Sequence, residues 1–290
     1  MAPVAATTAT ATALPTKLPT KRSLAGAASA GARVLIAGGL DDTKSSSATL
    51  WSFDPTSGAT DEAGRLPAAL HTPALAALGT GTLVMGGAKG NGTFDDVHLI
   101  DAEGKLRTTG TLPQPRTNAA ALTDGDGASV LLLGGWDGKS GTLEVLRTVD
   151  GATFTTVTTL LHPIRYPAVA MLGRSVWVIG GEWDKVLSSG IQRVDLDSGV
   201  VTDVAPLPVA LSRASAFTLG GSLFVAGGRT PDGRSNQIYR IDPLTGVISA
   251  AGALPEPRSD AAVAVSGTTA YLFGGQTDGP TDTVVAITAQ

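Results

Sequence analysis

The chain has no cysteine among its 290 residues, which excludes disulfide bonds, thiolate metal sites and cysteine nucleophiles. Only 16% of the residues are charged and the net charge is −4, so no basic stripe is present that could bind nucleic acid or an anionic membrane surface. No apolar run approaches the ~18 residues that a transmembrane helix needs. Aromatic residues make up only 4% of the chain, so the position of each one carries unusual information.

The first twelve residues also lack the features of a signal peptide. They are mostly Ala and Thr, without a basic segment followed by a bulky apolar core. We expect this segment to be the start of an extracytoplasmic or secreted protein whose signal has been replaced by Met1. A native cytosolic start is the alternative.

Glycine, in contrast, is abundant, with 37 residues. Six adjacent glycine pairs each follow a short apolar run, and their second members are separated by 48, 48, 46, 47 and 47 residues. A constant period of this length indicates a repeat array. The six pairs are Gly38-Gly39, Gly86-Gly87, Gly134-Gly135, Gly180-Gly181, Gly227-Gly228 and Gly274-Gly275.

The fifth repeat shows the internal pattern most clearly. It predicts four short strands, over 213–219, 222–226, 237–242 and 247–251, with Gly220-Gly221 as a two-residue hairpin turn. The second of these strands is a continuous apolar run, as expected of a strand buried on both faces. Four antiparallel strands per repeat predict an all-β fold, a six-bladed β-propeller of four-stranded blades.

Three features of the repeats resemble Kelch repeats. These are the glycine pair after the second strand, an Asp at the end of the third strand, as in Phe53-Asp54-Pro55, and a Pro-x-x-Arg approach to the next blade, as in 113–116. The resemblance covers roughly residues 18–290. It departs from the family in one respect, because the usual Trp of the fourth strand is replaced by Thr, Ala or Val.

The repeats predict one propeller domain over 1–290, with blades at about 18–66, 67–112, 113–161, 162–207, 208–254 and 255–290. The sixth repeat ends after its third strand, whereas residues 4–13 form a spare segment that resembles the other fourth strands. We therefore expect residues 4–13 to pair with residues 283–289 and to close the ring, which removes two exposed strand edges. A disordered Ala/Thr tail is the alternative.

Basic residues lie at equivalent positions before the first strand of every blade. In an up-and-down blade these segments share one face with the loops that follow the second strands, and that face is where we expect function. A cationic ring that binds carboxylates is one interpretation. The other is that each side chain binds carbonyl groups or an acid in a neighbouring blade. The residues are Arg22, His71, Arg116, Arg165, Arg213 and Arg258.

The loops after the second strands are less uniform, and two of the four tryptophans lie in them. Trp177, in contrast, is expected in the core, and Trp51 at the start of a third strand. A loop tryptophan beside acids can bind a sugar or anchor a protein contact. The alternative is that both tryptophans cover the blade tops. We expect one edge of a pocket to contain Trp136, Asp137, Arg165, Glu182, Trp183 and Asp184, with Tyr166 and Arg229 in the same region.

Several kinds of site are absent from the sequence. The three histidines show no metal-ligand spacing, and there is no nucleophile elbow or phosphate-binding loop. The segment 124–127 could be a calcium loop, but it lies where a hairpin turn belongs and lacks the later bidentate Glu. We therefore predict a turn there, and neither a metal nor a cofactor in the protein.

These observations favour a monomeric Kelch-like binding module that recognises a carbohydrate or an acidic protein segment at the loop face. The resemblance also implies two enzyme types. Galactose oxidase chemistry needs a Tyr–Cys crosslink, which a chain without cysteine cannot make. A small pocket enzyme similar to sialic-acid mutarotases, or a lyase, is the first alternative, with Glu182 as acid or base and an Arg for the substrate carboxylate. A structural domain of a larger surface protein is the second.

Overall fold

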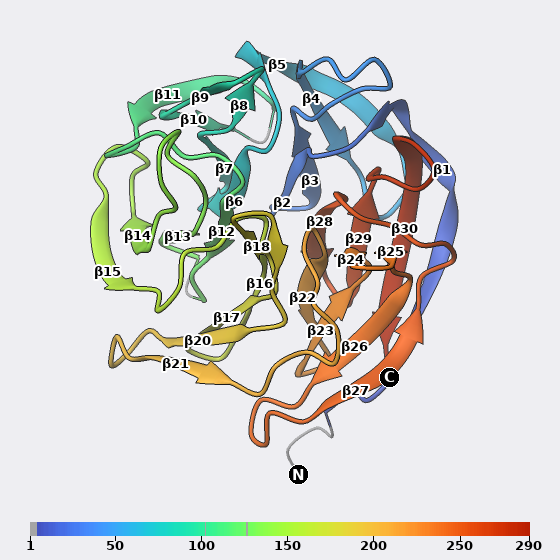
Figure 1. The fold of residues 1–290 in the computed structure, drawn as a ribbon. Helices are drawn as coiled ribbons and strands as arrows, with labels where there is room; N and C mark the ends of the chain where they lie inside the picture. The colour runs from blue at the N-terminus through green and yellow to red at the C-terminus, as the bar shows by residue number, and fades with distance from the viewer. Residues whose placement is uncertain (1–4, 102, 126) are drawn as a thin grey trace.

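The computed structural model describes residues 5–101, 103–125 and 127–290. The described residues form six four-stranded antiparallel sheets, arranged as blades around a central axis (Figure 1). Because strands follow one another outward within each blade, the first strand lies nearest the axis and the fourth lies at the rim. The predicted six-bladed propeller is therefore confirmed.

The blades take up consecutive parts of the chain. Blade 1 contains β2 (Gly26–Ala30), β3 (Arg33–Ala37), β4 (Ser47–Phe53) and β5 (Thr60–Leu70). Blade 2 contains β6 (Ala74–Leu78), β7 (Gly81–Met85), β10 (Asp96–Ile100) and β11 (Leu106–Thr111). Blade 3 contains β12 (Ala120–Thr123), β13 (Val130–Leu133), β14 (Glu144–Thr148) and β15 (Thr155–Thr159).

The other half of the ring follows the same order. Blade 4 contains β16 (Ala168–Leu172), β17 (Ser175–Ile179), β20 (Ile191–Asp195) and β21 (Val201–Val204). Blade 5 contains β22 (Ser215–Leu219), β23 (Ser222–Ala226), β26 (Gln237–Ile241) and β27 (Ile248–Ala253). Blade 6 contains β28 (Ala262–Ser266), β29 (Thr269–Phe273), β30 (Thr281–Ala289) and β1 (Ala9–Arg22). Three short ribbons are β8 (Ala88–Lys89) with β9 (Gly92–Thr93), β18 (Glu182–Trp183) with β19 (Val186–Leu187), and β24 (Arg229–Thr230) with β25 (Gly233–Arg234).

The glycine pairs end the second strands, where neighbouring blades come into backbone contact. Gly86 and Gly87 have φ angles of 58° and 107°, which side-chain-bearing residues rarely adopt. The N–H of Gly87 donates to the carbonyl of Arg116 in blade 3 at 2.9 Å. A Cβ atom on Gly86 would overlap the same carbonyl oxygen. The repeated glycines thus allow the blades to approach one another.

The hydrophobic core lies between the blades, in six clusters that each join two neighbouring blades. Every residue of β7, β17 and β23 is buried, which confirms that second strands are covered on both faces. Trp177 lies in this core, as predicted. Trp51 is also buried, but it lies within β4 and not at its start.

The ring is closed by β1, although this strand differs from its prediction. Ala9–Ala13 pair with 285–289 in the expected antiparallel direction. The strand then continues to Arg22, opposite Thr281, with two register irregularities, so residues 18–22 belong to blade 6 and not to blade 1. Residues 5–8 precede the strand, and Val4 lies outside the described residues. In the same way, β5 continues beyond the predicted boundary at residue 66 to Leu70.

Residues before β1 cross to blade 5. The N–H of Ala6 donates to the Gly220 carbonyl at 3.0 Å, in the hairpin turn predicted from the sequence. The carbonyl of Ala6 accepts hydrogen bonds from Ser222 Oγ at 2.5 Å and from Arg240 Nε at 3.0 Å. We call residues 5–8 the N-terminal strap, because they connect the closing strand to a second blade.

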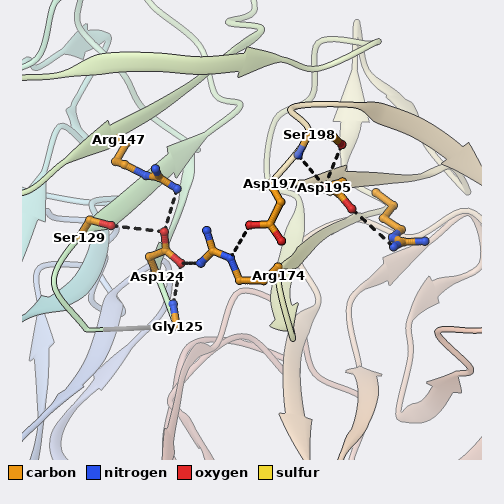
Figure 2. A network of polar contacts seen from close by, with 9 residues as sticks. Asp124, Gly125, Ser129, Arg147, Arg174, Asp195, Asp197 and Ser198 are labelled. Carbon is orange, nitrogen blue, oxygen red and sulfur yellow. Dashed lines mark hydrogen bonds and ion pairs between the residues drawn. The ribbon is translucent and has the colours of Figure 1, made fainter.

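A buried carboxylate joins blades 3 and 4 (Figure 2). Asp124 is 3% exposed, and its Oδ2 accepts a hydrogen bond from Arg147 of β14 at 2.8 Å. Its Oδ1 accepts one from Arg174 in the hairpin turn of blade 4. Arg174 Nε also donates to the exposed Asp197 at 3.0 Å. The segment beginning at Asp124 is the predicted turn, with the Gly127 N–H on the Asp124 carbonyl at 2.7 Å, and Asp126 lies outside the described residues.

A different set of aspartates stabilises the turns after the third strands. Asp150 accepts hydrogen bonds from the backbone N–H groups of Thr153 and Ala152, both at 2.8 Å, which lower its pKa to about 2. Backbone N–H groups also lower the pKa of Asp54, Asp195 and Asp242 at equivalent turns. The Asp at the end of the third strand, read from the sequence as a turn residue, therefore has that role.

These aspartates predict that the protein loses stability in acid. Each has a lower pKa when folded than when unfolded, so its stabilising effect is complete above the unfolded pKa of 3.8 and is lost as pH falls through the folded pKa. We expect the melting temperature, measured by circular dichroism, to fall between about pH 5 and pH 2. Asp150→Asn, which keeps an acceptor oxygen but does not titrate in this range, should show a smaller fall. A melting temperature that stays constant from pH 5 to pH 2 would contradict this prediction.

Candidate functional site at the channel mouth

Six residues surround one end of the central channel and line a cavity of about 130 Å³. Each lies two positions before the first strand of its blade, and each has a φ between 51° and 58°. In the described chain they account for six of the nine non-glycine residues with positive φ. We call them the mouth ring: Leu24, Thr72, Asn118, Tyr166, Arg213 and Asp260.

Backbone hydrogen bonds link the mouth ring from blade to blade. The N–H of Thr72 donates to the Leu24 carbonyl at 2.7 Å, and the N–H of Leu24 donates to the Asp260 carbonyl at 2.9 Å. The equivalent N–H groups of Tyr166, Arg213 and Asp260 each donate to the carbonyl of the mouth-ring residue in the preceding blade, at 2.9, 3.2 and 3.0 Å. Between blades 2 and 3, the hydroxyl groups of Thr72 and Thr117 lie 2.6 Å apart. The left-handed conformation therefore has a structural role in every blade.

The side chains of the mouth ring, unlike its backbone, differ in every blade. Glycine adopts the left-handed region freely, whereas an L side chain there costs about 1–2 kcal/mol. A scaffold that needed only the backbone bonds would be more stable with glycine. The presence of six different side chains at strained positions is typical of a functional site.

Arg213 is the most constrained side chain of the mouth ring. Its Nη1 donates to Asp260 at 3.0 Å, its Nη2 donates to Glu182 at 3.3 Å, and its guanidinium lies 3.6 Å from the centre of the Tyr166 ring. Burial lowers the pKa of Arg213, but Tyr166, Asp260 and Glu182 more than reverse this effect, so the pKa is raised. The charged guanidinium is therefore fixed between two carboxylates and an aromatic face.

Asn118 connects the other side of the ring. In the amide orientation that satisfies its neighbours, its amide N donates to the Tyr166 hydroxyl at 3.0 Å and to Thr72 Oγ1 at 3.3 Å. Its amide O accepts from Arg165 Nη2 at 2.8 Å. Thr72 and Asn118 are 8% and 6% exposed, so this part of the mouth is tightly packed.

Three aromatic side chains and one arginine follow one another outward from the ring. The Arg165 guanidinium lies 5.5 Å from the Tyr166 ring centre and 5.3 Å from that of Trp136. Trp136 in turn lies 6.0 Å from Trp183, with 45° between the ring planes. Both tryptophans are partly exposed. We call Tyr166, Arg165, Trp136 and Trp183 the aromatic ladder.

The mouth leads into the channel itself. A cavity of about 460 Å³ is lined by the first strands, mostly by alanine. Six residues line both this cavity and the mouth: Ala25, Pro73, Ala119, Pro167, Ala214 and Ala261.

The six basic residues predicted as equivalent occupy three different positions. Arg22, Arg116 and Arg258 lie four residues before the first strand, His71 and Arg165 lie three before it, and Arg213 lies two before it. The prediction that they share one position was wrong.

The three arginines furthest from the first strand are buried between strands and do not form a cationic ring at the mouth. Arg116 is 1% exposed, and its Nη1 donates to the Glu144 carbonyl at 3.1 Å. Burial lowers its pKa to about 10. Arg258 donates to the carbonyls of Gly274 and Thr283, at 2.8 and 3.1 Å. Arg22 lies 4.8 Å from the ring centre of the buried Trp51. The interpretation that these side chains bind carbonyl groups therefore applies to Arg116 and Arg258, whereas Arg22 packs on Trp51 and donates to Thr20 Oγ1 at 2.9 Å.

The remaining predicted residues do not belong to the mouth ring, and their side chains either bond within the loops or are exposed. Asp137 accepts hydrogen bonds from Lys139 N and Ser140 N, both at 2.6 Å, within its own loop. Asp184 is exposed in the turn between β18 and β19, and Arg229 is exposed in β24. His71 Nδ1 lies 3.0 Å from Ser46 Oγ, and burial lowers its pKa.

Four members of the mouth ring were not identified from the sequence: Leu24, Thr72, Asn118 and Asp260. They share no residue type, so inspection of side chains alone does not group them. Counting back two residues from each alanine-rich first strand would have found them.

The sequence matches no known family model and no curated protein. Within the described residues, no helix is long and apolar enough to cross a bilayer. The same part of the chain contains no group of three or more His, Cys, Asp or Glu residues placed to hold a metal ion.

Proposed function

We propose that this propeller is a Kelch-like binding module that recognises a carbohydrate at the mouth ring. One observation carries the proposal: six different side chains are kept at strained backbone positions around the mouth, although glycine would suit the scaffold better. Donors, acceptors and an aromatic ring converge there in fixed orientations. A ligand with many hydroxyl groups could use them without reorganising the site.

The charges of the site favour a neutral ligand over an acidic protein segment. Arg213 is already paired with Glu182 and Asp260, and Arg165 is bound to the amide of Asn118. Two guanidinium groups and two carboxylates therefore balance at the mouth. An acidic segment would have to compete with carboxylates that the protein itself supplies.

The same contacts favour binding over acid–base catalysis by Glu182. Its Oε1 accepts from Arg213, and its Oε2 accepts from Ser212 Oγ at 3.4 Å. Both carboxylate oxygens thus have partners within the protein. This arrangement suits a fixed acceptor that orients Arg213.

A thermal-shift screen against neutral sugars, sialic acids, acidic peptides and divalent cations tests the proposal. A ligand at about 100 times its Kd adds roughly 2.7 kcal/mol of stability, which corresponds to a shift of several degrees. We expect neutral sugars to raise the melting temperature. Asp260→Asn and Tyr166→Phe keep the shape of the mouth, and each should weaken sugar binding by about tenfold or more, because a charge-assisted or neutral hydrogen bond is lost.

Asp278→Asn is the matched control, because Asp278 is an exposed acid of the same blade outside the mouth ring. It should leave sugar affinity unchanged. A response to acidic peptides alone would replace the carbohydrate by a protein partner. Sugar binding that survives both mouth variants would place the ligand elsewhere.

A further inference from the structure

We infer that the site takes the end of a linear glycan chain, whose following units lie over the aromatic ladder. This inference rests on the proposed function and goes beyond it in naming the length and direction of the ligand. It depends on two further observations. One is the limited space inside the mouth ring, and the other is the course of the ladder away from it.

The mouth cavity is too small for the interior of a polysaccharide. Its volume of about 130 Å³ is well below the roughly 300–1,000 Å³ of pockets that enclose a whole ligand of drug size. Thr72 and Asn118 are almost fully buried, and they are bonded to each other across blades 2 and 3. A ligand wider than the mouth would have to push these two side chains apart and break this contact. One terminal unit can approach Arg213 and Asp260 without doing so.

The aromatic ladder provides a continuous path from the mouth to the top of blades 3 and 4. Tyr166 belongs to the mouth ring, and Arg165 bridges it to Trp136, which lies next to Trp183. Such partly exposed rings offer apolar faces for the C–H faces of sugars, and neighbouring polar groups can bind their hydroxyls. Nearby Asp184 is exposed and carries carboxylate oxygens for such bonds.

Gly141 provides the space in which Trp183, the outermost residue of the aromatic ladder, packs. A Cβ atom on Gly141 would lie 2.6 Å from Trp183 Cη2 and 2.7 Å from Pro163 Cβ. Trp183 of blade 4 therefore rests directly on the loop of blade 3. Gly141→Ala would displace the Trp183 ring without changing any group that could bind a ligand.

Isothermal titration with malto-, cello-, xylo- and chito-oligosaccharides of one to six units tests this inference. We expect affinity to rise about tenfold between one and three units of the series that binds, as successive units reach the two tryptophans, and then to level off. Trp136→Ala and Trp183→Ala should both abolish this gain. Trp183→Ala, which changes the ladder residue furthest from the mouth ring, should leave the affinity for the monosaccharide unchanged. Gly141→Ala should reproduce the effect of Trp183→Ala, and Trp183→Phe should restore part of the gain.

Val186→Ala is the matched control, because Val186 is an exposed apolar residue opposite Trp183 in the same ribbon. It should not alter the dependence on length. Cyclodextrins have no chain end, so they should bind much more weakly than malto-oligosaccharides if the malto series is the ligand.

Three results would overturn the inference alone while mouth-ring variants still weaken binding. They are full affinity for the monosaccharide, a length dependence that survives the tryptophan variants, and cyclodextrins that bind as well as linear chains. Failure of every series to bind would overturn the proposed carbohydrate function as well.

Discussion

Deletion of residues 1–16 is expected to lower the melting temperature by about 10 °C or more, or to abolish cooperative unfolding. The deletion removes the five residue pairs between 9–13 and 285–289, together with the strap contacts of Ala6. At about 1 kcal/mol per hydrogen bond, the loss of roughly five bonds is comparable with the whole stability of many domains. Ala6 and Ala9 are also buried in the cluster between blades 5 and 6, so apolar contacts disappear too.

A second consequence of this deletion is an exposed sheet edge. Without most of β1, β30 presents unpaired backbone groups along the rim of blade 6. We therefore expect the truncated protein to self-associate. Circular dichroism melts and size-exclusion chromatography with light scattering would measure the two effects. A truncated chain that remains monomeric and melts at the full-length temperature would contradict the proposed closure.

Deletion of residues 1–8 separates the strap from the closing strand. It removes the bonds of Ala6 to Gly220, Ser222 and Arg240. It also removes the backbone bonds of Thr7 and Thr8 to Gln290, but it leaves the pairs from Ala9 onward in place. We expect a smaller loss of stability and no self-association. An equal loss in both truncations would show that the strap, and not the strand pairing, provides most of the stabilisation.

The blades and their closure could be predicted because the sequence marks them with residues that have few alternatives. Gly86 and its equivalents lie where a Cβ atom would overlap the neighbouring blade, so glycine recurs at a constant interval. The last repeat contains only three strands of its own, and the spare N-terminal segment could supply the fourth. The extension of β1 to Arg22 was not predicted, because the added part contains Pro15 and Pro19, and proline has no N–H to donate to a neighbouring strand.

The mouth ring could not be predicted in the same way. Residues such as Leu24 and Tyr166 rarely adopt a positive φ, so their residue types do not indicate this conformation. The backbone bonds between blades impose this conformation, and those bonds depend on the completed ring. Local preferences therefore give no indication of the site.

The arginines show that a shared residue type does not establish an equivalent position in the blades. The chain approaches blades 1, 3 and 6 with an Arg four residues before the first strand, but it has Leu70 at the corresponding position of blade 2. Buried guanidinium groups such as that of Arg258 bind carbonyls between strands, whereas Arg213 faces the mouth. One or two positions along the chain thus separate a structural arginine from a candidate ligand-binding one.

Replacement of Asp124 by alanine is the second substitution expected to have a large effect on stability. Asp124 is the common acceptor for Arg147 and Arg174, so its removal leaves Arg147 without a carboxylate partner and leaves Arg174 with only the exposed Asp197. Removal of one partner from a fully buried pair costs about 3–5 kcal/mol. The arginine side chains remain 30% and 44% exposed, and water partly screens them, so we expect a smaller loss of about 2 kcal/mol. The melting temperature should then fall by about 5 °C.

Asp197→Ala is the matched control, because it removes the other carboxylate bound to Arg174 (Figure 2). Asp197 is 68% exposed, and an exposed ion pair contributes only about 0–1 kcal/mol. Added salt should reduce its small effect further and should change that of Asp124→Ala much less, because buried pairs are screened less. Chemical denaturation of both variants at low and high salt would measure the difference. Equal destabilisation by the two substitutions would show that burial of Asp124 between blades 3 and 4 adds nothing to the interaction. A loss confined to Asp124→Ala would show that this carboxylate stabilises the contact between the two blades on the side of the propeller opposite the mouth, in addition to the hydrogen bond from Thr158 to the Gly199 carbonyl.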